Sequence, residues 1–339
     1  MTSPTVRKFL KYFISLAIAL GILWYVFRDQ NVPEMFQKLK SFDYKWVIVS
    51  VLLAMVSHLF RAYRWQILLN ATGHRTKLFR TFLAVMIGYL TNLIMPRMGE
   101  VSRCGILKRT DDVPISKSFG SVILERILDF LTFALLLLIN FVLEFDRLKS
   151  YLGPIFFSNT GSSNNNKLYF LLMLVLLGAI VLIIIRVYKN KLENSLLYKK
   201  IKEFVLNMLQ GLTSIGKIEN KTGFWLSTLF IWVLYYAMSY VVVFSAPETS
   251  GLSLIAGLTI LTMGSLGMIA PVQGGIGTYH AMVGGALVLY GITAEDGKLF
   301  AFILHTSQTL GVIIVGCIAL IISAVIVKDR KVSSTQITS

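Results

Sequence analysis

The sequence predicts an all-α integral membrane protein with about six transmembrane helices and two re-entrant hairpins, forming a single transmembrane domain over residues 1–339. Three observations support this fold class. Of all residues, 55% are hydrophobic and 15% are charged, whereas soluble domains carry about 25% charged residues. Apolar segments of about 20 residues recur, and each is long enough to cross a hydrocarbon core about 30 Å thick. Two further apolar regions are interrupted by proline and glycine.

Six uninterrupted apolar segments are long enough to span a bilayer. They lie at about 9–27, 46–69, 118–145, 168–187, 224–245 and 299–327. The first is long, and no small-residue cleavage site follows it, so we expect it to be a retained span rather than a signal peptide.

Two apolar regions are broken in the middle. The region 78–107 is interrupted by PRMGE at 96–100, and the region 253–290 is interrupted by PVQGGIG at 271–277. Proline and clustered glycine end helices. We therefore expect each region to form a pair of helices that enters the membrane and returns on the same side. Two full spans per region are the alternative, because they would preserve the same sidedness.

The distribution of lysine and arginine predicts the orientation. The chain carries 33 lysines and arginines against 17 aspartates and glutamates, a formal net charge of +16. Most of these bases cluster at the ends of hydrophobic segments, as topology signals do, which argues against a nucleic-acid-binding surface. With both broken regions re-entrant and both termini cytoplasmic, most of the bases fall on the cytoplasmic side. We expect the protein in the plasma (inner) membrane.

This topology makes two parts of the chain inverted copies of each other. The units 46–145 and 224–327 each contain a span, a broken region and a long span, and their hairpins would enter from opposite sides. Inverted repeats with broken helices that meet near the midplane recur in transporters. Between the units, residues 191–215 carry an apolar stripe flanked by lysines, which predicts an amphipathic helix on the inner membrane surface.

Charged residues at the first break are candidates for binding an anion. Arg97, Glu100 and Arg103 lie in or beside it. A charged residue at membrane depth is costly, so it is usually buried in protein or lines a wet cavity. Arginine beside a helix N-terminus suits a phosphate group. The alternative is that Glu100 pairs with one of the two arginines and only locks the hairpin.

A second charged cluster lies in the span at 118–145. Glu125 and Asp129 are four residues apart and share one helix face, and Arg126 lies between them in sequence. The two carboxylates repel each other and need a cation from another helix. The candidate cations are Arg61, Arg64, Arg97 and Arg103. The cluster predicts either coupling to protons or cations, or an ion-pair network that holds the hairpin.

The second break offers a polar side chain beside glycines. Gln273 precedes Gly274 and Gly275, and glycine allows close approach of a headgroup or of another backbone. Thr278 and His280 open the returning helix. We expect this loop to line a cavity, and tight packing of the hairpin alone is the alternative.

Motifs for catalysis or metal binding are absent from the sequence. There is no P-loop, no H-E-x-x-H zinc motif and no G-x-S-x-G nucleophile motif, and Cys104 and Cys317 lack metal-type spacing. We interpret His58 and His305 as packed side chains, and Trp65, near a span end, as part of the interfacial aromatic belt. We therefore expect neither an enzyme, nor a cofactor, nor a metal site.

Four motifs, taken in order, resemble a known family. They are RAYRW at 61–65, NLIMPRMGEVSR at 92–103, SVILERILD at 121–129 and PVQGGIG at 271–277. Together they resemble the flippase-like membrane region of lysylphosphatidylglycerol synthases, and the stand-alone membrane proteins that share it, over nearly the whole chain. In the full-length synthases this region is thought to move an aminoacylated phospholipid between leaflets, while a cytoplasmic domain attaches the amino acid. The resemblance implies a lipid-translocating architecture without an aminoacyltransferase domain.

The leading hypothesis is a flippase that moves an anionic lipid headgroup, such as that of a phospholipid or a polyprenyl phosphate, between leaflets. Arg97 and Arg103 would bind the phosphate, and the two hairpins would alternate in exposing it. The candidate binding residues are Arg61, Arg64, Asn92, Arg97, Glu100, Arg103, Gln273, Gly274, Gly275, Thr278 and His280.

Two other classes of function stay open at the level of sequence. One is a membrane-embedded lipid-modifying transferase that uses Glu125 or Asp129 as a base. The other is a non-catalytic assembly partner of an envelope enzyme. The expected partner is a membrane lipid with an anionic headgroup and not a nucleic acid, and a second copy of the chain or an envelope enzyme is the protein partner that these alternatives allow.

Overall fold

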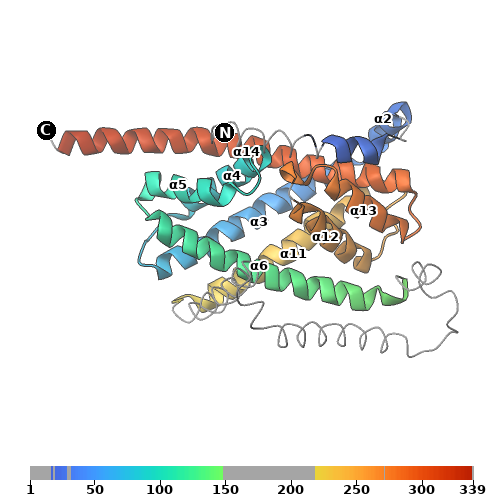
Figure 1. The fold of residues 1–339 in the computed structure, drawn as a ribbon, viewed down its shortest axis with the longest axis horizontal. Helices are drawn as coiled ribbons and strands as arrows, with labels where there is room; N and C mark the ends of the chain where they lie inside the picture. The colour runs from blue at the N-terminus through green and yellow to red at the C-terminus, as the bar shows by residue number, and fades with distance from the viewer. Residues whose placement is uncertain (1–16, 18–19, 29–31, 148–217, 271, 338–339) are drawn as a thin grey trace, which may run out of the picture. The chain divides into compact units, whose positions relative to one another are not determined.

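The computed structural model describes residues 17, 20–28, 32–147, 218–270 and 272–337, in which every regular element is a helix (Figure 1). The chain groups into two compact units, one made of Met1–Asn140 with Ile218–Ser339 and the other of Phe141–Lys217. Of the second unit, the structure describes the last turn of a long helix and the residues up to 147.

Two of the predicted elements fall outside the described residues, namely the span at 168–187 and the amphipathic helix at 191–215. Of the predicted span at 9–27, residues 20–27 are described and are helical. The helices discussed below all belong to the first unit, except for the last residues of α6.

The first half of the chain forms five described helices. They are α2 (Val32–Ser41), α3 (Tyr44–Ala71), α4 (Leu78–Ile94), α5 (Gly99–Asp111) and α6 (Ile115–Leu143). Asp43 caps α3 by accepting a hydrogen bond from the backbone N–H of Lys45 at 3.2 Å. The helix α4 ends two residues before Pro96, because the residue before a proline avoids the helical region. Asp112, in the left-handed conformation, ends α5.

The second half repeats the order of a long helix, two short helices and a long helix. Its elements are α11 (Lys221–Val241), the short 3₁₀ turn η2 (Val242–Ser245), α12 (Leu254–Ile269), the 3₁₀ turn η3 (Gln273–Gly275), α13 (Thr278–Val288) and α14 (Ala294–Ile337). Side-chain caps start two of these helices. Asn220 accepts from Gly223 N–H at 2.8 Å before α11, and Ser253 accepts from Ala256 N–H at 3.3 Å before α12.

Among the described residues, three helices are long and apolar enough to cross a membrane by length and composition. They cover Tyr44–Ala71, Lys221–Ser245 and Ala294–Lys328, where the sequence predicts spans at 46–69, 224–245 and 299–327. The predicted span at 118–145 is one continuous helix, α6, of 29 residues. Leucine, isoleucine and valine side chains on these helices are widely exposed, as expected for contact with lipid tails. The chain is therefore an integral membrane protein.

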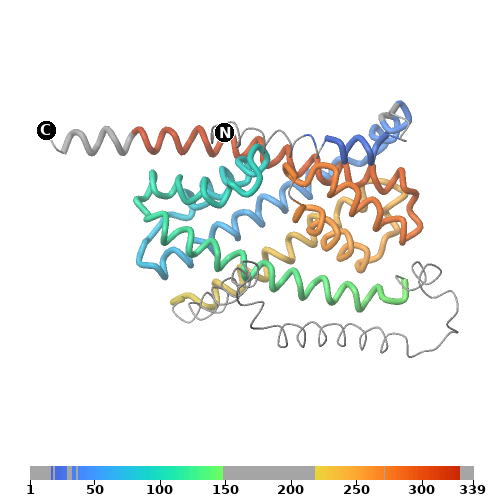
Figure 2. Tube along the Cα trace, in the orientation of Figure 1, coloured from blue at the N-terminus to red at the C-terminus, as the bar shows by residue number. Residues whose placement is uncertain are grey.

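The helices of the first unit pack in pairs (Figures 1 and 2). The two long helices α3 and α11 lie against each other, α4 packs on α5, and α12 packs on α13. The helix α14 runs along α13, α4 and α3. Close backbone approach brings α4 and α5 together, since a Cβ on Gly88 would lie 3.0 Å from the carbonyl oxygen of Gly99.

Both predicted helix breaks are present, and they meet in space. The first lies between Ile94 and Gly99, and the second lies between Ile269 and Thr278, with Pro271 outside the described residues. The turn η3 of the second break contacts α4, and a Cβ on Gly274 would lie 3.0 Å from the Cδ2 of Leu93. The two interruptions in the chain thus belong to one region of the fold.

Candidate functional site

Six charged residues from three helices gather beside the first break. This buried charge cluster consists of Arg61 and Arg64 on α3, Arg103 on α5, and Glu125, Arg126 and Asp129 on α6. Residues three or four apart share one face of a helix, so Arg61 and Arg64 lie together on α3, and Glu125 and Asp129 lie together on α6. The break after α4 adds α5 to the cluster, since it starts that helix at Gly99 and so places Arg103 in its first turns.

The carboxylates of the cluster are shared among the arginines. Arg61 Nη1 lies 2.6 Å from Glu125 Oε1 and 2.8 Å from Asp129 Oδ2. Arg64 Nη2 lies 2.6 Å from Asp129 Oδ1 and 3.3 Å from Glu125 Oε1. Arg103 Nη1 lies 3.0 Å from Glu125 Oε2, an ion-pair contact without hydrogen-bond geometry. The cations that the two acids require therefore come from α3 and α5.

Burial separates the members of the cluster. Arg64 and Glu125 are fully buried, and Arg61 and Arg103 are each 4% exposed. Arg126 differs, because its side chain is 44% exposed while its Nη2 lies 3.4 Å from Glu125 Oε1. Three buried arginines therefore face two carboxylates, and the buried part of the cluster holds one positive charge in excess.

Some guanidinium donors of the cluster are buried without a hydrogen-bond partner among the described residues. They are Nε and Nη2 of Arg103 and Nε of Arg64. Buried donors are nearly always satisfied in folded proteins, so unpaired ones point to a missing acceptor. Together with the charge excess, they make this cluster the candidate site for an anion.

Uncharged side chains that sequence reasoning did not select complete the cluster. Tyr235 on α11 accepts a hydrogen bond from Arg61 Nε at 3.1 Å, and Thr228 accepts one from Arg64 Nη1 at 3.5 Å. The Arg103 guanidinium lies 4.5 Å from the ring centroid of Trp65. The assignment of Trp65 to the interfacial belt was wrong: the residue is fully buried, because it lies four positions after Arg61 on the inward face of α3.

The other candidates at the first break lie outside the cluster. Arg97 is exposed and adopts a positive φ of 65°, and Glu100 is partly buried. Neither forms an ion pair among the described residues, so these residues do not show the lock between Glu100 and Arg97 or Arg103 that was the alternative to phosphate binding. Asn92 has a structural contact, since its Oδ1 accepts a hydrogen bond from Gly99 N–H at 2.7 Å.

The candidates at the second break form a separate group. Gln273 and His280 are buried, at 6% and 3% exposure. Gly274 and Gly275 adopt φ values of 56° and 72°, which side chains rarely tolerate. Thr278 donates its hydroxyl hydrogen to the carbonyl of Gly267 at 2.7 Å and so ties α13 to α12. These contacts hold the turn together.

The candidate binding residue His280 and His305, interpreted from the sequence as a packed side chain, lie close to each other at the second break. The rings of His280 and His305 have centroids 5.1 Å apart. His305 Nε2 donates to the carbonyl of Gly274 at 2.8 Å, and its ring stacks on Tyr279 at 4.7 Å. His58, the third single histidine, packs on Tyr89 with centroids 4.6 Å apart. No sequence pattern signalled the pairing of His280 with His305, since it depends on how α13 lies against α14.

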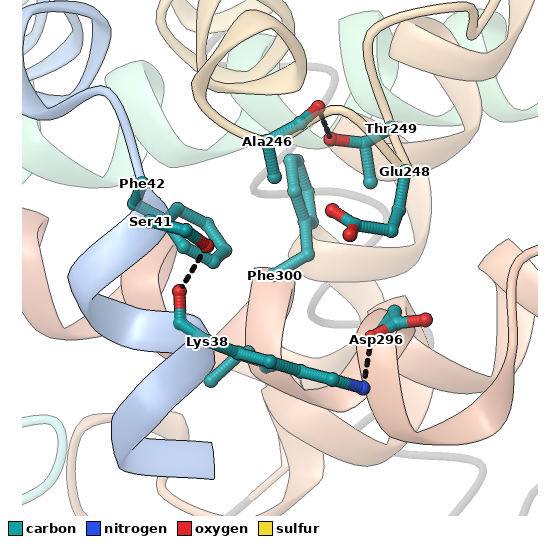
Figure 3. A pocket seen from close by; sticks show the side chains of 9 residues that line it. Lys38, Ser41, Phe42, Ala246, Glu248, Thr249, Asp296 and Phe300 are labelled. Atoms are coloured by element: carbon teal, nitrogen blue, oxygen red, sulfur yellow. Dashed lines mark hydrogen bonds and ion pairs between the residues drawn. The ribbon is translucent and has the colours of Figure 1, made fainter. Parts of the chain in front are cut away.

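A small pocket lies elsewhere in the first unit (Figure 3). Its lining includes Lys38 of α2, Glu248 of the loop after η2, and Asp296 and Phe300 of α14. Lys38 Nζ lies 2.9 Å from Asp296 Oδ1 and 3.4 Å from Glu295 Oε1. The hydrogen bond to Asp296 is the main reason that the pKa of Lys38 is raised. Lys38 thus pairs with the acidic residues at the start of α14 and joins α2 to α14.

The described residues contain no group of three or more histidine, cysteine, aspartate or glutamate side chains placed to hold a metal ion. Glu125, which is fully buried, and Asp129, whose side chain is 12% exposed, are both held by arginines.

The sequence of the chain matches a known family of proteins. Residues 12–316 match the family described as the lysylphosphatidylglycerol synthase TM region. The chain is 27% identical over 145 residues to a UPF0104 membrane protein of Methanocaldococcus jannaschii, a match that covers 41% of the chain and 42% of that protein. It is 24% identical over 140 residues to a UPF0104 membrane protein of Pyrococcus horikoshii, covering 40% of the chain and 41% of the relative.

A third relative carries a different name. The chain is 29% identical over 120 residues to the glycosyltransferase AglD of Haloferax volcanii, which covers 35% of the chain and 18% of that protein. The chain thus spans about two fifths of the length of the two UPF0104 relatives and less than a fifth of the third. No solved structure matches the chain. The family match covers most of the sequence, and the chain therefore belongs to the family of the lysylphosphatidylglycerol synthase transmembrane region.

Proposed function

We propose that this chain is a flippase that moves an anionic lipid headgroup between the leaflets of the plasma (inner) membrane, and that it is not an enzyme. The observation that carries the proposal is the charge excess of the buried cluster, in which Arg61, Arg64 and Arg103 face only Glu125 and Asp129. A buried charge without a partner is strongly destabilising in a membrane protein. An anionic headgroup at the cluster would supply the missing negative charge.

The lengths of the short helices support the proposed pair of re-entrant hairpins. At 1.5 Å per residue, the 17 residues of α4 extend about 26 Å and the 13 residues of α5 about 20 Å. The 16 residues of α12 extend about 24 Å and the 11 residues of α13 about 17 Å. Each is shorter than a hydrocarbon core of about 30 Å, so a helix pair that enters and returns accounts for them better than two full crossings.

The repeated order of elements supports the proposed inverted repeat. The unit 46–145 and the unit 224–327 each run from a long helix through two short helices to a long helix, and the two breaks contact each other. In transporters with this plan, substrate binds where the broken helices meet. Both termini would be cytoplasmic, and alternate movement of the hairpins would expose the headgroup to each side while the acyl chains stay in lipid.

The two carboxylates give the proposed transport a means of coupling. Glu125 and Asp129 already neutralise arginines of the cluster, so a headgroup that binds there competes with them for the guanidinium donors. Protonation of one carboxylate would free positive charge for the headgroup, and its deprotonation would favour release. A proton gradient that changes the rate of transport is the expected sign of this coupling.

Reconstitution in vesicles tests the transport directly. The purified chain is placed in proteoliposomes with a fluorescent phosphatidylglycerol, and a quencher that cannot cross the membrane is added outside. We expect the inner-leaflet label to become accessible to the quencher. For a fluorescent diacylglycerol, which has no charged headgroup, we expect the protein not to increase the rate of movement between leaflets. Equal rates for protein-containing and empty vesicles, with phosphatidylglycerol and with polyprenyl phosphate, would contradict the proposal.

The relative named as a glycosyltransferase favours a second candidate, a membrane-embedded lipid-modifying transferase. In that case Glu125 or Asp129 would act as a base on a lipid hydroxyl. The matched part is 18% of that relative, so it need not include the part of that protein that performs the transfer. Incubation with radiolabelled sugar nucleotides and membrane lipids separates the two candidates, because only a transferase incorporates label into lipid.

A further inference from the structure

The guanidinium of Arg103 presents two unused donors from a buried position. The side chain is 4% exposed, and both Nε and Nη2 lack a hydrogen-bond partner among the described residues. Its third nitrogen, Nη1, faces Glu125 Oε2 at 3.0 Å. The other two buried arginines differ, since Arg61 donates through Nε to Tyr235 and Arg64 donates through Nη2 to Asp129.

The two unused nitrogens form a fork. In the planar guanidinium, the N–H bonds of Nε and of Nη2 lie on the same edge and point in parallel. Such an edge matches two oxygens of one phosphate or carboxylate group and binds them bidentately. Because Nη1 faces Glu125, the fork is directed away from that carboxylate.

Packing fixes the direction of the fork. The guanidinium lies over the indole of Trp65, 4.5 Å from the ring centroid. Trp65 is fully buried, and its Nε1 donates to the hydroxyl of Ser121 at 2.8 Å. Ser121 in turn donates to the carbonyl of Ser118 at 2.7 Å. A cation held over an aromatic face in this way keeps its orientation without a ligand.

The excess of positive charge among the buried residues indicates that the ligand is an anion. Arg61, Arg64 and Arg103 are buried against Glu125 and Asp129, which leaves one positive charge uncompensated inside the protein. Arg126 is not counted in this balance of buried charges, because its side chain is 44% exposed. A group with a single negative charge shared by two oxygens balances this excess, and a phosphodiester has that charge and that geometry.

We infer that the Nε–Nη2 edge of Arg103, held by Trp65, binds one singly charged phosphodiester group, and we call this binding site the seat. The inference deepens the proposed function and rests on it for the source of the ligand, which would be the headgroup of a membrane phospholipid. The same chemistry could come from a soluble phosphate compound, and the binding experiment separates the two sources.

The test measures lipid binding to the purified full chain in detergent by native mass spectrometry. The probes are phosphatidylglycerol, diacylglycerol without phosphate, and glycerophosphoglycerol, which is the same phosphodiester headgroup without acyl chains. The variants are Arg103→Gln, which removes charge and fork, and Arg103→Lys, which keeps the charge beside Glu125 but has no fork. Arg109→Gln is the matched control, because Arg109 is an exposed arginine on the same helix.

We expect Arg103→Gln and Arg103→Lys each to weaken phosphatidylglycerol binding by roughly tenfold or more, as loss of a charge-assisted bidentate contact does. Arg109→Gln and diacylglycerol binding should stay unchanged. Parent-like binding by Arg103→Lys would overturn the seat, since charge alone would then suffice. This variant retains the ion pair with Glu125, so it reports on the seat even if Arg103→Gln does not fold.

The same probes and variants also test phosphodiester binding at the seat independently of the proposed lipid transport. Glycerophosphoglycerol that binds the parent as tightly as phosphatidylglycerol would overturn the lipid as the source of the ligand. Binding that depends on the Arg103 fork in a parent that moves no lipid would support the seat and contradict the flippase. Transport that persists in Arg103→Lys at the parent rate would overturn the seat and leave the flippase.

Discussion

Asn92 accepts a hydrogen bond through Oδ1 from the backbone N–H of Gly99 at 2.7 Å, across the first break. The contact joins the last turns of α4 to the first residue of α5, whose N-terminus has no other side-chain cap. At the second break, the hydroxyl of Thr278 joins α13 to the carbonyl of Gly267 on α12. At each break, a polar side chain thus joins the two helices on either side of it.

Replacement of Asn92 should loosen the first helix pair. Asn92→Ala leaves the buried N–H of Gly99 without an acceptor, which costs about 1–3 kcal/mol. We expect the free energy of unfolding in mixed detergent micelles to fall by that amount. Thr91→Val is the control, because the hydroxyl of Thr91 bonds only within its own helix, to the carbonyl of Ile87. Equal stability of Asn92→Ala and Thr91→Val would show that the contact does not hold the pair.

Close packing of α4 on α5 predicts opposite effects for two glycines of one helix. A Cβ on Gly99 would meet the backbone oxygen of Gly88 and the side chain of Asn92, whereas a Cβ on Gly105 would meet nothing within 4 Å. Gly99→Ala should therefore destabilise the protein by about 1–3 kcal/mol. Gly105→Ala should be neutral or stabilise by up to about 1 kcal/mol, since alanine favours helix. Thermal unfolding of both variants checks the order, and a tolerated Gly99→Ala would contradict the close approach.

The buried charge cluster should behave as one unit in a double-mutant cycle. Arg61→Gln and Glu125→Gln should each cost about 3–5 kcal/mol, because each leaves a buried charge without its partner. The double variant should cost less than the sum by about 0.5–3 kcal/mol, because it removes both charges together. The free energies of unfolding of the parent, the singles and the double give this coupling.

The control for that cycle is the pair Arg80 and Asp111, whose charged atoms lie 2.9 Å apart with the arginine side chain 27% exposed. Coupling there should be smaller than in the cluster, because solvent reaches the partly exposed Arg80 side chain and weakens its ion pair, although the Asp111 side chain is 7% exposed. Additive costs for Arg61 and Glu125 would mean that the two residues do not share their stabilisation.

The contact of Lys38 with Asp296 predicts a dependence of stability on alkaline pH. The hydrogen bond to Asp296 raises the pKa of Lys38 above its ordinary value of 10.5. The ammonium form therefore stabilises the fold fully below pH 10.5, and this contribution is lost as the pH rises through the raised pKa. We expect the stability difference between the parent and Lys38→Met to shrink above that pH. Lys40→Met, which removes an exposed lysine of the same helix, is the control.

The sequence predicted the parts of the site that depend on neighbours along one helix. Glu125 and Asp129, four residues apart, were expected to share a face and to need cations from another helix, and Arg61 and Arg64 lie opposite them. Trp65 could have been predicted as buried by the same periodicity, because it follows Arg61 by four residues. Its position near a predicted span end suggested a membrane interface instead.

The sequence could not predict which of the arginines near the first break joins the cluster. Arg97 and Arg103 are six residues apart and equally plausible by type, yet only Arg103 reaches Glu125. The reason is the turn itself: Arg97 sits in it with a positive φ and is exposed, while Arg103 lies one turn inside α5. Contacts across a turn depend on its backbone geometry, which local composition does not specify.

The amino-acid sequence by itself determined that this chain is a membrane protein and where its long helices lie. It also determined where proline and glycine interrupt two further apolar regions. Those properties follow from the length of apolar segments and from the backbone limits of single residues, and both are local. Only the tertiary structure decided that the two breaks touch, that His280 lies beside His305, and that Arg103 keeps two buried donors free over Trp65. These relationships arise because distant helices pack on one another, and packing depends on the fit of side chains that are far apart in the chain.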